Sequence, residues 1–271
     1  MISIVQKILR AIRQPGFYAR RTGQIILLRL TSLFARRSFF LQSRMDIDPS
    51  SFWHNPKFIA SSGGFTPKGE VVPRTIVETA PWDLVRRDML ILLIRGVLER
   101  GVEGSFAELG VYKGETARLI HHYAPERRLR LFDTFSGFDA RDLSEEQAQT
   151  GQTVTDGVFT DTSLEAVQAY VSPRSDAIIF HKGLFPETCD EAVLAERFAF
   201  VHLDADLYQP ILAGLEIFYP RLSPGGVLVI HDYNAWEGAR RAVDEYFADK
   251  PEVPVAMPDK SGSAVVIKAR A

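Results

Sequence analysis

The sequence predicts an α/β fold in which a mostly parallel sheet carries helices on both faces. Short apolar runs alternate with stretches of helical periodicity beyond residue 100, which is typical of a parallel sheet covered on both sides. Glycine or acidic residues directly follow several of these runs, where such sheets bind their ligands. With 271 residues, 46% of them hydrophobic, the chain is long enough for one sizeable core.

The chain divides into three segments by composition. Residues 1–48 form a basic arm, because residues 1–45 contain nine Lys or Arg and no acid while the whole chain has a net charge of −2. Two interpretations of this arm stay open: it packs on the body or on a second subunit, or it lies as an amphipathic helix on a membrane surface. Its apolar spacing favours self-association, so we expect a homo-oligomer.

Residues 49–81 are rich in Pro, Gly, Ser and Thr and show no sustained period, which predicts an irregular, lid-like cover. Residues 82–271 form the remaining domain. The single cysteine, Cys189, excludes an internal disulfide framework and a cysteine-based metal site, so a cytoplasmic protein is expected. No run of about 18 uncharged apolar residues predicts a membrane-spanning helix.

The elements of the domain follow from the periodicity. Apolar residues at helical spacing predict a first helix over Trp82–Arg100, and Gly101 gives its stop signal. The predicted strands are Ser105–Leu109, Leu129–Asp133, Ala177–His181, Phe198–Asp204, Gly226–His231 and Ser263–Ala269. The other predicted helices are Lys113–Tyr123, Leu164–Tyr170, Cys189–Ala195, Pro210–Tyr219 and Trp236–Asp249. The stretch Ser136–Ser175 is too long for a simple crossover and predicts an insertion near the site.

A glycine turn follows the first strand. Gly110 and Gly114 let the backbone approach a ligand closely, and the next helix offers unpaired N–H groups. The spacing is not that of the dinucleotide fingerprint, which argues against a nucleotide-dependent dehydrogenase and for a smaller cofactor. Asp133 ends the second strand, where an acid binds ribose hydroxyls in this architecture. The alternative is an ordinary tight turn without a ligand.

Acidic and imidazole groups end the fourth and fifth strands. Asp204 and Asp206 follow the fourth strand, and His231 and Asp232 follow the fifth. Carboxylates that converge from two strands suit a hard divalent cation such as Mg²⁺.

A structural explanation of these residues is equally open at this point. Asp204 could cap the next helix, and Asp232 could pair with Arg240 or Arg241. His231 could simply form a hydrogen bond beside a cofactor, and His202, inside an apolar strand, is expected to be buried and satisfied.

Five segments together resemble the macrocin O-methyltransferase family, which includes the novobiocin sugar methyltransferase. They read F-A-E-L-G-V-Y-K-G-E-T, L-F-D-T-F-S-G-F, H-K-G-L-F-P-E-T, F-V-H-L-D-A-D-L-Y and S-P-G-G-V-L-V-I-H-D-Y-N. The resemblance extends from about Pro73 to Lys268. It implies a Rossmann-like class I methyltransferase that uses S-adenosylmethionine and Mg²⁺ to methylate a sugar hydroxyl of a small-molecule natural product or a glycan, with no nucleic-acid partner.

The resemblance also implies roles for particular residues. Asp206 is the expected general base, and Asp204 and Asp232 are expected metal ligands. This chain adds His231 as a third expected ligand, which the resemblance itself does not supply. The expected cofactor-binding residues are Glu108, Gly110, Val111, Gly114, Thr116, Asp133, Thr134, Phe135, Lys182, Gly183 and Asp204.

One residue departs from the family pattern, which usually has two consecutive acids where this chain has His231 and Asp232. Imidazole favours zinc, iron or nickel over magnesium. This departure keeps open a binding protein without catalysis. Separately, a methyltransferase that acts on a small phenol or catechol stays open, because fold analogy alone does not identify the acceptor.

Overall fold

The computed structural model describes residues 83–155, 157–172 and 175–270. The predictions for residues 1–48 and 49–81, including the lid, membrane contact and self-association, lie outside these residues, as does Trp82. No helix in the described part of the chain is both long and apolar enough to cross a bilayer.

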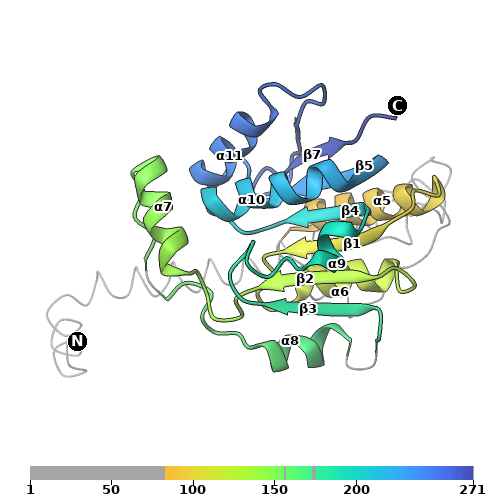
Figure 1. Cartoon of the computed structure of the whole chain (residues 1–271), viewed down its shortest axis with the longest axis horizontal. Helices are drawn as coiled ribbons and strands as arrows, with labels where there is room; N and C mark the ends of the chain where they lie inside the picture. Colours follow the sequence, from red (N-terminus) through yellow and green to blue (C-terminus); the bar gives the residue numbers. More distant parts are fainter. Residues whose placement is uncertain (1–82, 156, 173–174, 271) are drawn as a thin grey trace, which may run out of the picture. The chain divides into compact units, whose positions relative to one another are not determined.

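The described residues form a seven-stranded sheet with the strand order β3-β2-β1-β4-β5-β7-β6. Strands β1 to β5 run parallel, and β7 runs antiparallel to β5 and β6 (Figure 1). The strands are β1 (Ser105–Leu109), β2 (Leu129–Asp133), β3 (Ile178–Lys182), β4 (Phe198–Leu203), β5 (Leu222–Ile230), β6 (Val255–Ala256) and β7 (Ala264–Ile267). The predicted α/β class is therefore confirmed.

Helices cover both faces of the sheet because successive strand residues point to opposite sides and both sets are apolar. Phe106 and Phe200 face one layer, while Ala107 and Val201 face the other, and all four side chains are buried. The first layer contains α5 (Leu84–Glu99), α6 (Glu115–Tyr123) and α8 (Leu164–Val171). The second contains α9 (Glu191–Ala195), α10 (Tyr208–Phe218) and α11 (Glu237–Phe247).

Apart from shifts of one or two residues at the ends of other elements, the structure differs from the sequence prediction in three elements. The insertion contains an unpredicted helix, α7 (Ala140–Thr150), whose mostly polar sequence hides the helical period. Strand β5 begins at Leu222 rather than Gly226, because Pro224-Gly225 lies within the strand at a register irregularity against β4. The two-residue strand β6 is too short to leave a periodic signal.

The sheet topology brings the predicted site residues to one edge. Strand order reverses between β1 and β4, and parallel strands all end on the same side, which is where ligands bind in open α/β sheets. Figure 1 shows α7 (green) at this edge, beside the ends of α10 and α11. The turn after β1 and the loops after β4 and β5 meet there.

Candidate active site

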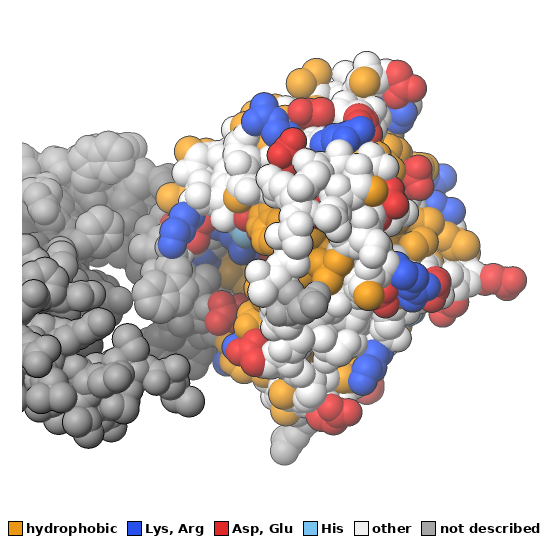
Figure 2. Space-filling view, turned by 90° about the vertical axis from the view of Figure 1, so that its left-hand side faces the viewer, with side chains coloured by type: hydrophobic (Ala, Val, Ile, Leu, Met, Phe, Trp, Pro, Cys, Tyr) orange, Lys and Arg blue, Asp and Glu red, His pale blue; other side chains and the backbone are white. Residues whose placement is uncertain are grey.

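A cavity of about 420 Å³ lies at the carboxyl edge of the sheet. It takes residues from every segment that the sequence singled out: Glu108, Gly110, Val111, Thr116, Asp133, Thr134, Gly183, Asp204, Asp206, His231 and Asp232. The corresponding face is hollowed, with hydrophobic side chains recessed among charged ones (Figure 2). Three predicted site residues, Gly114, Phe135 and Lys182, do not line the cavity. Phe135 is buried in the core, and the Lys182 side chain is exposed.

The glycine turn after β1 lies at the reversal of strand order. Gly110 has a φ of +84°, and a Cβ built on it would lie 2.1 Å from the backbone oxygen of Asp204. Only glycine fits this position, because a side chain would push apart the turn and the loop that follows β4. The Gly110 backbone is thereby held against the segment that carries the candidate catalytic acid.

Asp133 organises the floor of the cavity. Its Oδ2 accepts hydrogen bonds from the backbone N–H groups of Val111 (2.7 Å) and Tyr112 (2.9 Å), and its Oδ1 accepts one from Phe135 (2.5 Å). A carboxylate oxygen can accept more than one hydrogen bond, so Asp133 can also receive ligand hydroxyls. Its contacts tie the turn after β1 to the end of β2.

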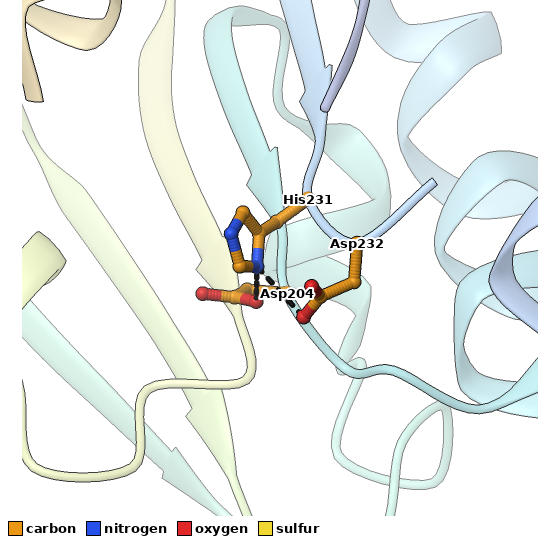
Figure 3. Close-up of side chains that lie close together, drawn as sticks. All are labelled: Asp204, His231 and Asp232. Carbon is orange, nitrogen blue, oxygen red and sulfur yellow. Dashed lines mark hydrogen bonds and ion pairs between the residues drawn. The ribbon is translucent and has the colours of Figure 1, made fainter. Parts of the chain in front are cut away.

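Asp204, His231 and Asp232 form a compact cluster (Figure 3). The Nδ1 atom of His231 lies 2.7 Å from Oδ1 of Asp204 and 2.8 Å from Oδ2 of Asp232, so the ring points its nitrogen between the two carboxylates. Each residue offers one ligand atom, and these atoms lie within 4.8 Å of one another. The two predicted strand ends therefore converge as the sequence suggested.

The charges in this cluster shift its ionisation. Burial lowers the pKa of His231, but the charge of Asp204 and the hydrogen bonds with both carboxylates outweigh burial and raise it to about 9. Burial raises the pKa of Asp204, but the positive charges of Arg86 and His231 outweigh burial and lower it. These shifts favour a protonated His231 ring between ionised Asp204 and Asp232.

Asp206 completes the group of acids. Burial raises its pKa well above the usual range, and its hydrogen bond to Asp232 and the charge of Asp204 add to the effect. Burial also raises the pKa of Asp232, but hydrogen bonds with His231 and Asp206 outweigh burial and lower it. The backbone φ of Asp206 is +60° and that of Asp232 is +57°, a conformation that Asp tolerates better than most residues.

Arg86, on the first turn of α5, is a site residue that the sequence analysis missed. Its Nη2 donates to Oδ2 of Asp204 at 2.5 Å and to the hydroxyl of Thr116 at 3.2 Å. About a fifth of each side chain in the Arg86–Asp204 pair is exposed. Nothing in the periodic pattern of α5 marks this arginine, because its partner lies 118 residues away.

A second buried pair lies beneath the cluster. The Nδ1 atom of His202 lies 2.9 Å from Oε1 of Glu108, and both side chains are almost fully buried. Burial lowers the pKa of His202 to about 3 and raises that of Glu108 well above its usual range. Within the described residues, Oε2 of Glu108 and Nε2 of His202 have no hydrogen-bond partner, so His202 is buried as expected but only half satisfied.

The partners that the structural explanation gave to the strand-end acids are wrong. Helix α10 begins at Tyr208. The backbone N–H of Tyr208 donates to Oε2 of Glu146 at 2.7 Å, so Glu146 rather than Asp204 caps this helix. Arg240 and Arg241 pair with acids one turn along their own helix and not with Asp232. Both Asp204 and Asp232 instead turn toward His231.

Comparison with known proteins relates this chain to a family. A 4'-O-methyltransferase of a rhamnosyl-tetracenomycin from Streptomyces olivaceus is 33% identical over 173 residues, which are 60% of this chain and 65% of that protein. Mycinamicin III 3''-O-methyltransferase from Micromonospora griseorubida is 32% identical over 164 residues, 56% of this chain and 64% of the relative. The matches therefore span slightly less than two thirds of each relative's length.

Solved structures and a family model complete the comparison. The O-methyltransferase NovP has a TM-score of 0.58 at 20% identity, covering 89% of this chain and all of that one. Calicheamicin methyltransferase CalS11 has a TM-score of 0.52 at 19% identity, covering 85% and 90%. These two likenesses establish the class I methyltransferase fold. The model of the macrocin-O-methyltransferase (TylF) family matches residues 84–265, about two thirds of the sequence, and the chain belongs to that family.

Proposed function

We propose that the protein transfers a methyl group from S-adenosylmethionine to a hydroxyl oxygen of a sugar carried by a natural product or glycan. The observation that carries the proposal is the shared cavity, in which the Gly110 turn and Asp133 lie together with Asp204, Asp206 and Asp232. The names of the two relatives support a glycoside acceptor, because both are O-methyltransferases of glycosylated natural products.

The proposed cofactor site uses the turn after β1 and the end of β2. Gly110 allows close approach of the cofactor, and Asp133 would accept hydrogen bonds from the ribose hydroxyls. Thr116 and Gly183 line the same cavity and extend the proposed site toward the start of α6 and the end of β3. The expected roles of Phe135 and Lys182 would be backbone roles, because their side chains do not line the cavity.

The proposed reaction is an in-line displacement. The acceptor oxygen attacks the methyl carbon, a C–O bond forms, and the C–S bond breaks with its electron pair moving to sulfur, which leaves S-adenosylhomocysteine. The hydroxyl proton passes to a carboxylate oxygen of Asp206 in its ionised form, whose raised pKa makes it a stronger base. Binding both molecules in one cavity removes much of the entropic barrier to their reaction. Fixed backbone contacts hold the turn and loops that line this cavity in place.

The residues present fit a divalent cation. The Nδ1 atom of His231 and one oxygen from each of Asp204 and Asp232 already converge, and a ligating imidazole would release its Nδ1 proton to solvent as the cation binds. A bound cation supplies Lewis-acid stabilisation of the oxygen that loses its proton. We propose Mg²⁺ as the resident ion on family grounds, with His231 improving the affinity for ions that imidazole binds well, such as Zn²⁺ or Fe²⁺.

The test combines binding and transfer. Titration calorimetry should show S-adenosylhomocysteine binding, and radiolabelled S-adenosylmethionine should label a glycoside but not catechol. NAD serves as the negative ligand. Labelling of catechol alone would overturn the sugar assignment, and absence of both binding and transfer would overturn the methyltransferase proposal.

Metal binding has its own readout. Electron paramagnetic resonance of added Mn²⁺ should show a bound fraction that Mg²⁺ displaces in wild type and that Asp232→Asn largely removes. Equal Mn²⁺ binding by both proteins would contradict the assigned ligands.

A further inference from the structure

Four aromatic rings from four separate segments form a continuous row beside the cavity. The ring centroids of Tyr112 and Phe159 are 4.9 Å apart, those of Phe159 and Phe138 are 5.3 Å apart, and those of Phe138 and Trp236 are 6.1 Å apart. All three contacts are edge-to-face. We call these four residues the ring row; the sequence analysis assigned none of them a role.

The ring row joins the two halves of the site. At one end, the backbone N–H of Tyr112 donates to Asp133 at 2.9 Å. At the other end, the backbone N–H of Trp236 donates to the carbonyl of Asp232 at 2.9 Å. The row therefore reaches from the proposed cofactor turn to the loop with the acidic cluster, and its first three rings line the cavity in half-buried positions.

The backbone at two of these rings is strained. Phe159 has a φ of +61° and Tyr112 a φ of +50°, a region that bulky residues rarely adopt. Of the five non-glycine residues with positive φ in the described part of the chain, four line this cavity: Tyr112, Phe159, Asp206 and Asp232. Strained backbone of this kind clusters at functional sites. Phe159 has the same positive φ as the proposed base Asp206, although Phe159 is far from every strand end in the sequence.

We propose that the ring row is the platform that carries the sugar ring of the acceptor. The face of an aromatic ring is electron-rich, and the axial C–H groups on one side of a pyranose ring carry partial positive charge, so the two surfaces attract. The hydroxyl groups at the rim of the sugar need acceptors instead, and the carboxylates of Asp139 and Asp142 line the same cavity. This inference rests on the proposed function.

The platform explains why an insertion follows β2. The loop that carries Phe159 is tied to the cofactor turn, because the hydroxyl of Thr162 donates to the carbonyl of Tyr112 at 2.7 Å. Asp161 also accepts from the Tyr112 hydroxyl at 2.5 Å and pairs with Lys113 at 2.6 Å. These contacts hold the Phe159 ring over the cavity from outside the motifs that bind the cofactor.

The experiment measures acceptor and cofactor separately. The probe is methyl α-L-rhamnopyranoside, chosen because one relative acts on a rhamnosyl group and because its aglycone has no ring. Phe159→Leu and Phe138→Leu should each raise the KM for the glycoside about three- to tenfold, as expected for loss of one aromatic contact. The affinity for S-adenosylhomocysteine should stay within about twofold, and Phe159→Tyr should restore the KM.

A matched control and a second readout keep the proposal falsifiable. Tyr123→Leu removes a half-buried ring on α6 that does not line the cavity and should leave the KM unchanged. Saturation-transfer NMR of the glycoside on protein loaded with S-adenosylhomocysteine should show saturation of the sugar C–H protons that Phe159→Leu weakens.

Each remaining outcome overturns the platform. The platform is wrong if the KM for the glycoside is unchanged in both leucine variants. If cofactor binding weakens while this KM stays unchanged, the rings contact the adenosine of the cofactor instead. Absence of saturation transfer to this glycoside or to the methyl glycosides of other hexoses in wild type also overturns the platform. Methyl transfer that continues in these cases leaves the proposed function standing, so the two failures are distinguishable.

Discussion

The two ends of β4 carry charged groups in opposite arrangements. Just before the strand, Glu196 accepts hydrogen bonds from Arg130 (2.7 and 2.8 Å) and Arg128 (2.6 Å), so one carboxylate meets two guanidinium groups. Just after the strand, Asp204 and Asp206 lie close to a third carboxylate, that of Asp232. The positive partners in this group are the guanidinium of Arg86 and the imidazole of His231. The start of β4 therefore has a carboxylate whose charge two arginines balance, and its end has a cluster of acids with fewer positive partners.

This difference separates what stabilises the fold from what performs chemistry. Partial burial raises the pKa of Glu196, but hydrogen bonds and the charges of Arg130 and Arg128 outweigh it and lower the pKa to about 2. The pKa of Asp206 moves the other way, because burial and neighbouring acids disfavour its charged form. Groups with such perturbed ionisation cluster at functional sites, and Asp206 fits that pattern while Glu196 fits an ion pair.

The largest effect is expected for Asp206→Asn. Asparagine has nearly the same volume and tolerates the left-handed backbone at this position, but it cannot take the acceptor proton. Turnover should fall about 10²- to 10⁴-fold, the usual range for loss of a general base. Binding of S-adenosylhomocysteine, measured by calorimetry, should persist.

Unfolding by urea provides the control for this variant. Its free energy of unfolding should stay close to that of wild type, because the asparagine amide can still donate a hydrogen bond to Asp232, as the neutral carboxyl of Asp206 does. Retained turnover would show that another group accepts the proton.

A smaller effect, on stability, is expected from a substitution where α7 packs against α10 and α11. Glu146 on α7 is fully buried, and a Cβ built on Gly238 would lie 2.1 Å from its Oε2 atom. Gly238→Ala should therefore lower the free energy of unfolding by about 1–3 kcal/mol, as overpacking usually does. Thermal denaturation should show a Tm lower by several degrees.

A double-mutant cycle tests the cause. In a Glu146→Ala background, where the carboxylate is absent, Gly238→Ala should cost little or nothing. An equal cost in both backgrounds would place the clash elsewhere. Glu146→Ala alone should also destabilise, because the backbone N–H of Tyr208 loses its partner.

The smallest effect concerns the stabilising end of β4. Because the pKa of Glu196 is lower in the folded protein than in the unfolded chain, its contribution is fully present above about pH 4.5 and is lost as the pH falls toward 2. Glu196→Gln should cost about 1 kcal/mol at pH 6, since the pair is partly exposed to solvent. This difference from wild type should shrink on acidification.

Urea unfolding at pH 6 and pH 3 measures this difference, with Glu187→Gln as the control. Glu187 forms an exposed pair with Arg141 at 2.7 Å, and its loss should produce no measurable change at either pH. A pH-independent cost in Glu196→Gln would mean that packing rather than charge carries the effect.

Much of the site could be predicted from local sequence. The turn at Gly110 and the acids at Asp133, Asp204 and Asp232 follow directly from strands that the apolar pattern marks, and the edge of a parallel sheet brings strand ends together. Sequence could not separate a cation site from helix capping at Asp204, because that choice depends on where Glu146 comes to lie, 62 residues before the N–H that it caps.

The sequence by itself determined the fold class, the five parallel strands and which of their ends carry acids, because hydrophobic periodicity is a local property of the chain. Only the tertiary structure decided that Arg86 pairs with Asp204, that α7 forms at the edge of the site, and that four rings align beside the cavity. These features depend on contacts between residues far apart in the chain, and such contacts leave no periodic signal in any one segment.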